Sequence, residues 1–193
     1  MKTVRTVIQT ILVIALIISI GASIVVINGQ TTNGYSSTTK CSPAAREWII
    51  EQFGDAKDIY ELLDNINNFV SSRTYIPRQP SDIVQYFSID KFIFEDTCNG
   101  LCFDFACFTA ISVREICKFK NWDNITAVVV DVKSTRVAKS YHSFNFIHFN
   151  NKIFYIDTTF DMEKSDKVGA VNIGNYSMEE FSALLGWEIF AYH

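Results

Sequence analysis

The sequence lacks any excess of positive charge. It has 17 Lys and Arg residues against 21 Asp and Glu residues, and its formal net charge is -4. Two of the cations, Lys2 and Arg5, belong to the first 27 residues, so the charge of the rest falls by these two to -6. A nucleic-acid-binding domain carries a basic face or stripe. An acidic chain without one excludes nucleic acid as the expected partner.

Patterns that bind metal ions are also missing. No group of carboxylates has the spacing of a calcium loop. Cys98 and Cys102 have a spacing that zinc tolerates, but no second close pair of ligands follows them. We therefore expect no metal and no other cofactor, and a structural zinc site made of Cys98, Cys102 and His142 is kept only as an alternative.

Charge is absent from the apolar run Val7 to Ile27, which follows Lys2 and Arg5. The run has the ~20 residues of a membrane-spanning helix and exceeds the apolar part of a signal peptide. Positive charges before the run predict that the body of the chain lies on the extracytoplasmic side. Residues 1–27 are predicted to be a membrane anchor, with a cleaved signal and a secreted protein as the alternative.

Residues 28–41 are polar and rich in Gly, Ser, Thr and Asn, which is typical of a flexible linker. Residues 42–193 are predicted to form one domain. The whole chain is 48% hydrophobic and 14% aromatic, with 16 Phe residues, so a packed core is expected.

The domain is predicted to be of the α+β class. Its front half has helical spacing at 44–53 and 58–70, and a short helix is expected through Phe87. The segment Leu101 to Cys117 is apolar nearly all round, which predicts a central buried helix. Strand-like runs follow at 125–132, 142–149 and 152–158, and a final helix begins after Ser177. We expect Trp187 on the apolar side of that last helix.

Cys102 lies in the first turn of the predicted central helix, directly after the turn signal Asn99-Gly100. Unpaired backbone N–H groups and the positive end of the helix dipole favour a thiolate there. The chain has five cysteines, an odd number that cannot all pair within one chain. Cys107 and Cys117 are interpreted as buried thiols, and Cys102 is the candidate nucleophile.

The residues Asn150-Asn151 between two strand-like runs predict a tight hairpin. Phe149 then faces Lys152, and side chains of alternate residues share one face of the sheet. His142 and Asp157 become diagonal neighbours with Cα atoms ~7–8 Å apart, a gap that an imidazole and a carboxylate can bridge. His148 shares that face near the turn and is interpreted as structural.

Three blocks of sequence resemble the transglutaminase-like superfamily, whose fold is related to that of papain-like cysteine peptidases. They are 100–106 (GLCFDFA), 142–146 (HSFNF) and 154–161 (FYIDTTFD), and the resemblance spans 100–161, roughly a third of the chain. The resemblance implies a catalytic triad of Cys102, His142 and Asp157 in an α+β fold, with the central helix packed on an antiparallel sheet. Phe144 stands where the family usually has a tryptophan. The backbone N–H of Cys102 is a candidate oxyanion donor.

These residues predict an exported thiol enzyme that acts on amide bonds of a protein or peptide substrate through an acyl-enzyme on Cys102. Water as acceptor would make it a peptidase or amidase, and a lysine amine would make it a transglutaminase. Hydrolysis is slightly favoured because the single domain shows no second module for an amine donor. The alternatives are a catalytically inactive domain that serves as a binding module, and an acyl transferase similar to arylamine acetyltransferases.

Overall fold

The structure is a computed structural model that describes residues 41–76, 87–138, 140–159 and 170–193. The chain divides into two units, 1–36 and 37–193, and all described residues belong to the second. The predicted anchor at 1–27 and nearly all of the predicted linker lie outside the described residues. Within the described ranges, no helix is long and apolar enough to cross a membrane.

Two capped helices begin the described part of the chain. Helix α2 (Pro43–Phe53) follows Ser42, whose hydroxyl accepts a hydrogen bond from the Ala45 N–H at 3.1 Å. Helix α3 (Ile59–Ser71) follows Asp58, whose carboxylate accepts from the Glu61 N–H at 2.9 Å. Both caps satisfy backbone donors that a helix leaves unpaired at its start. The two helices are those expected from the spacing of apolar residues.

A short helix, α4 (Ile89–Phe94), comes next and was not predicted. It contributes Phe92 to the core, where the Phe92 ring contacts the rings of Phe105 and Phe108 at centroid distances of 5.9 and 5.3 Å. The short helix expected through Phe87 falls on residues 81–86, which the structure does not describe, and Phe87 itself is not helical.

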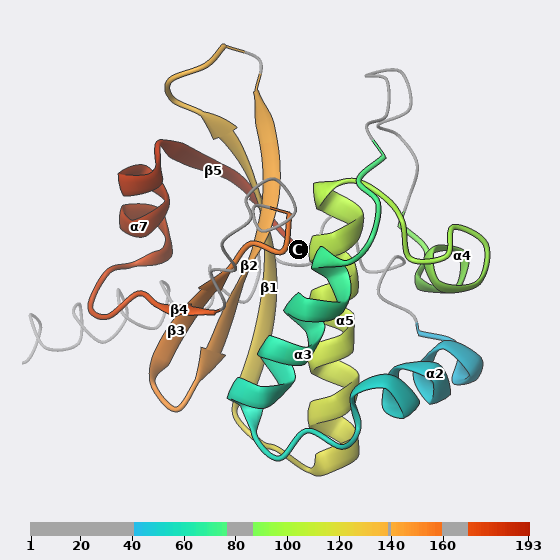
Figure 1. Ribbon diagram of the computed structural model, residues 1–193. Coiled ribbons are helices and arrows are strands. Elements are labelled where there is room, and N and C mark those ends of the chain that lie inside the picture. The colour runs from blue at the N-terminus through green and yellow to red at the C-terminus, as the bar shows by residue number, and fades with distance from the viewer. Residues whose placement is uncertain (1–40, 77–86, 139, 160–169) are drawn as a thin grey trace, which may run out of the picture. The chain divides into compact units, whose positions relative to one another are not determined.

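Helix α5 (Cys102–Lys120) is the central element of the domain. Helices α2 and α3 pack against it, and strands β1 (Ile125–Ser134) and β2 (Tyr141–Phe149) pack against it as well (Figure 1). Because neighbours cover it from several sides, its residues are buried nearly all round, as its apolar sequence predicts. It ends at Asn121, which adopts the left-handed conformation at φ 55°.

The described residues form an antiparallel sheet of five strands in the order β4-β3-β2-β1-β5. Strand β3 (Lys152–Ile156) pairs with β2 so that Phe149 lies opposite Lys152, which confirms the predicted register. The hairpin turn has Asn150 at φ 48° and Asn151 at φ 58°. Positive φ at both positions matches the right-handed twist of the strands, and asparagine tolerates it.

The two faces of the sheet carry separate clusters of buried side chains. One face packs on α5 through residues that include Ala127, Val129 and Ile147. The other face packs on helix α7 (Met178–Leu185) through residues that include Val130, Phe144 and Phe146. Strand β4 (Val171–Asn172) lies at one edge of the sheet. The expected α+β class, with the central helix packed on an antiparallel sheet, is confirmed.

The end of the chain differs from the prediction. Helix α7 has the expected capping box of Ser177 and Glu180, but it ends at Gly186, which has φ 86°. Trp187 is therefore not part of the helix. It begins a fifth strand, β5 (Trp187–Tyr192), which pairs with β1 at the opposite edge of the sheet from β4. Leu184 and Leu185 are exposed. Helix α7 packs on the sheet through Met178 and Phe181.

Candidate active site

Cys102 is the first residue of α5, as the sequence predicts. The first backbone hydrogen bond of the helix runs from the Phe105 N–H to the Leu101 carbonyl at 3.0 Å. The Cys102 N–H precedes that bond and belongs to the first turn, where N–H groups point along the helix axis. Asp104 closes the turn because its carboxylate accepts from the Leu101 N–H at 3.0 Å.

The segment that leads to Cys102 is fixed to residues 74–76. The Gly100 carbonyl accepts a hydrogen bond from the Ile76 N–H at 2.7 Å, and the Asn99 side chain accepts one from the Thr74 N–H at 2.8 Å. Gly100 is needed because a Cβ there would lie 2.7 Å from the Asp104 carboxylate. The position of Cys102 is thus set on both sides, by this segment and by the helix.

His142 lies near the start of β2, and Asp157 follows the last residue of β3. The His142 Nε2 atom is 2.7 Å from an Asp157 carboxylate oxygen. The same oxygen accepts a hydrogen bond from the Tyr155 hydroxyl at 3.1 Å, and the other oxygen accepts from the Thr159 N–H at 3.1 Å. The diagonal contact predicted from the hairpin is confirmed, and the carboxylate is held in one orientation by two further donors.

The Cys102 thiol lies close enough to the His142 imidazole to contribute to raising its pKa. Since Nε2 faces Asp157, the other ring nitrogen, Nδ1, is the one left to face Cys102. Burial lowers the pKa of His142, but the hydrogen bonds and charges of Asp157 and Cys102 outweigh it and raise the pKa to about 10. The structure therefore brings the three predicted residues together around a ring that is held protonated.

Trp187 covers this imidazole and was not predicted to do so. Its ring centroid lies 5.5 Å from that of His142, with 34° between the planes. The ring of Phe144 lies 6.0 Å from the same imidazole. An indole next to His142 thus comes from β5 rather than from β2. Gly186, a residue type that commonly ends a helix, is the sequence signal that could have placed Trp187 outside the helix.

The other four cysteines are poorly suited to act as nucleophiles. All five cysteines lie in the described residues and are free thiols. Burial, with smaller contributions from nearby carboxylates, raises the pKa of Cys41 to about 11, and burial raises those of Cys98 and Cys117 to about 11 as well. Burial and the charges of two aspartates hold the pKa of Cys107 well above its usual range. A protonated buried thiol is inert.

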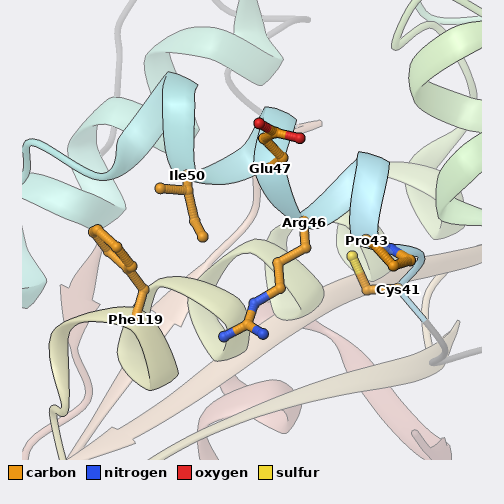
Figure 2. Close-up of a pocket in the computed structure, with 6 residues that line it drawn as sticks. All are labelled: Cys41, Pro43, Arg46, Glu47, Ile50 and Phe119. Carbon is orange, nitrogen blue, oxygen red and sulfur yellow. The ribbon is translucent and has the colours of Figure 1, made fainter.

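A surface hollow of about 500 Å³ lies between α2 and the last turns of α5 (Figure 2). Arg46, one of its lining residues, forms a salt bridge with Glu115 at 3.1 Å. Phe119 forms part of an apolar wall of the hollow. None of the three predicted site residues lines it. In the described ranges, no three His, Cys, Asp or Glu side chains are arranged to hold a metal ion, so the zinc alternative gains no support there.

His148 is half-buried on β2, six residues along the strand from His142, and burial lowers its pKa. It pairs in register with Ile153 near the hairpin turn, away from Asp157. Its interpretation as a structural residue agrees with this position.

No protein-family model matches the sequence, and no curated protein matches it. The chain is similar in structure to a proposed cysteine protease from Cytophaga hutchinsonii, at 15% identity and a TM-score of 0.48, over 82% of this chain and 54% of that one. It is also similar to a TGase, at 16% identity and a TM-score of 0.42, over 86% of this chain and 44% of that one. The chain thus spans about half the length of each. The described elements have the α+β arrangement, with a central helix packed on an antiparallel sheet, that the resemblance of the sequence implies.

Proposed function

We propose that the chain is a thiol-dependent enzyme that cleaves amide bonds through an acyl-enzyme on Cys102. One observation carries the proposal: the His142 imidazole is hydrogen-bonded to Asp157 at 2.7 Å and at the same time lies close enough to Cys102 to interact with its sulfur. This is the relation between nucleophile, base and orienting acid that acyl transfer requires. Cys102 and His142 are 40 positions apart in the chain, and His142 and Asp157 are 15 apart, so their meeting is a property of the fold.

In the proposed reaction, the Cys102 thiolate attacks the carbonyl carbon of the amide. The tetrahedral oxyanion is bound by the Cys102 N–H in the first turn of α5. The C–N bond then breaks, and the proton carried by His142 passes to the leaving amine. A thioester to Cys102 and a neutral imidazole remain.

The second half of the reaction removes the acyl group. Neutral His142 accepts a proton from the incoming water, whose oxygen attacks the thioester carbonyl. The C–S bond breaks, which regenerates the thiolate beside a protonated imidazole and releases a carboxylic acid. Asp157 keeps the ring in place throughout, because Tyr155 and Thr159 hold its carboxylate.

Alkylation of Cys102 by iodoacetamide in the purified full-length chain tests the proposal. Fast labelling at pH 6 that collapses in His142→Ala is expected, since the protonated imidazole stabilises the thiolate. His148→Ala is the matched control, and its labelling should equal that of the unaltered chain. Labelling that rises only above pH 8, and at the same rate in His142→Ala, would favour a catalytically inactive binding module.

Product analysis then identifies the acceptor. A glutamine-containing peptide is incubated with the chain and an excess of a primary amine, and the acid and amide products are measured. Hydrolysis to the acid is expected to exceed amine incorporation. Amine incorporation in excess would make the chain a transglutaminase, and transfer from an acyl thioester to an arylamine would favour the acetyltransferase alternative.

We also propose that the domain acts on the extracytoplasmic side of a membrane, anchored by residues 1–27 or secreted after their removal. The charge-free run Val7 to Ile27 behind Lys2 and Arg5 supports this. Protease added outside intact cells that express the chain should digest the domain. Full protection of the domain in intact cells would contradict the proposal.

A further inference from the structure

A second cluster of polar side chains lies on the face of the sheet that packs on α5. Asp131 of β1 is its centre. One carboxylate oxygen accepts a hydrogen bond from the Ser143 hydroxyl at 2.6 Å, and the other lies 2.8 Å from His193 Nε2. The cluster joins β1, β2 and the residue that follows β5. The side chain of His193 is only 9% exposed, so this contact is a built feature of the interior.

The cluster borders both halves of the candidate active site. Ser143 is the neighbour of His142 on β2 and points to the opposite face of the sheet. His193 contacts Phe103, the residue after Cys102, with ring centroids 5.8 Å apart and the planes at 89°. An edge-to-face aromatic contact of this kind fixes the relative position of two rings. His193 therefore touches the helix turn that carries Cys102.

The backbone holds His193 as firmly as its side chain does. Its N–H donates to the Val129 carbonyl at 2.8 Å, and its carbonyl accepts from the Val129 N–H at 3.0 Å. The ring is thus fixed at the backbone, at Nε2 and along one edge. This residue, which the sequence alone did not distinguish, lies at a junction between the sheet and the start of α5.

The arrangement does not form a second nucleophilic site. Asp131 stands between the two donors, and Ser143 directs its proton to Asp131 rather than to the imidazole. Cys107 faces Asp131 from α5, but it is buried, and burial and the charges of Asp131 and Asp104 hold its pKa well above the usual range. The polar groups of this cluster hydrogen-bond one another, and the cluster offers no nucleophile. Its role is therefore to hold the residues that it contacts in place.

We propose that His193 is a positioning residue for Cys102: its imidazole, fixed by Asp131, supports the Phe103 ring and so holds the first turn of α5 against His142. The inference rests on the proposed function, in which Cys102 is the nucleophile. A thiolate and an imidazolium interact only within a narrow range of separation. A displacement of about 1 Å can lower reactivity by up to about 100-fold.

The test measures the rate constant for iodoacetamide labelling of Cys102 from pH 5 to 9, together with the melting temperature, in the full-length chain. His193→Ala is expected to slow labelling at pH 6 about tenfold. His193→Gln should restore it to within about threefold, because its amide N–H reaches the place of Nε2 and donates to Asp131. His148→Gln makes the same chemical change away from the junction and should leave the rate unchanged.

Phe103→Leu tests the contact between the Phe103 and His193 rings from its other side. It replaces His193→Ala as the test if that variant does not fold. It should slow labelling about as much as His193→Ala, and the double variant should be no slower than either single one, because both break one contact. Wild-type labelling in His193→Ala or Phe103→Leu, with labelling still lost in His142→Ala, would overturn only this inference. If the unaltered chain and His142→Ala are labelled at the same rate, the proposed function is overturned, and this inference with it.

Discussion

The protonation of His142 gives the sharpest prediction from this structure. Replacing Asp157 by Asn removes the charge and the acceptor that lie 2.7 Å from Nε2 while keeping the shape of the side chain. With Asp157 in place, the pKa of His142 is raised to about 10. Without it, burial lowers the pKa and Cys102 alone raises it, so we expect the pKa to fall well below 10, toward that of an ordinary histidine.

The rise from about 6.5 to about 10 corresponds to about 5 kcal/mol of interaction, at about 1.4 kcal/mol for each unit. Because the folded state binds the proton more tightly than the unfolded state, whose histidine pKa is about 6.5, the pair stabilises the fold fully below that pH. The stabilisation is lost as the pH rises through about 10. In Asp157→Asn, the unfolding free energy should be lower at pH 6 and nearly independent of pH between 7 and 10.

NMR titration of ¹³C-labelled histidine in the full-length chain measures this directly, with His142→Ala used to assign the signal. The His142 resonance should titrate near pH 10 in the unaltered chain and well below that pH in Asp157→Asn. Urea unfolding at several pH values gives the linked change in stability. A His142 signal that titrates near 6.5 in both chains would refute the interpretation of the site as a protonated imidazole held by Asp157.

Three further predictions concern the surroundings of the site. Gly100→Ala places a Cβ 2.7 Å from the Asp104 carboxylate and should lower the unfolding free energy in urea by about 1–3 kcal/mol. Asn145→Ala removes a hydrogen bond of 2.9 Å to a backbone carbonyl of α5 and should cost about 1–3 kcal/mol in the same assay. Trp187→Leu keeps an apolar cover but removes the ring, and it should lower the pKa of His142 by at most about one unit, measured by the same NMR titration.

Local features of this site could be read from the sequence. The two asparagines of the hairpin set the register of β2 and β3, and that register made His142 and Asp157 neighbours across two adjacent strands. The apolar circumference of 101–117 revealed a buried helix, and the turn signal before it located Cys102 at the start. In each case the deciding residues lie within a few positions of one another, where turn chemistry and side-chain periodicity act directly.

The remaining features depend on packing between distant segments. Ser177 and Glu180 fixed the start of α7, but the left-handed Gly186 ended it before Trp187, and pairing with β1 drew the following residues into an edge strand. The pairing of β5 with β1 is what places the Trp187 ring next to His142.

The sequence by itself determined the local positions of the candidate site residues, because a cysteine at a helix start, a histidine and an aspartate were each identifiable from their neighbours. The tertiary structure alone decided which groups surround them. His193 meets Asp131 across 62 positions of the chain, a contact that no local periodicity encodes. Such contacts form because α5 and the sheet must bury their apolar faces against each other, and that burial brings Cys102 to His142.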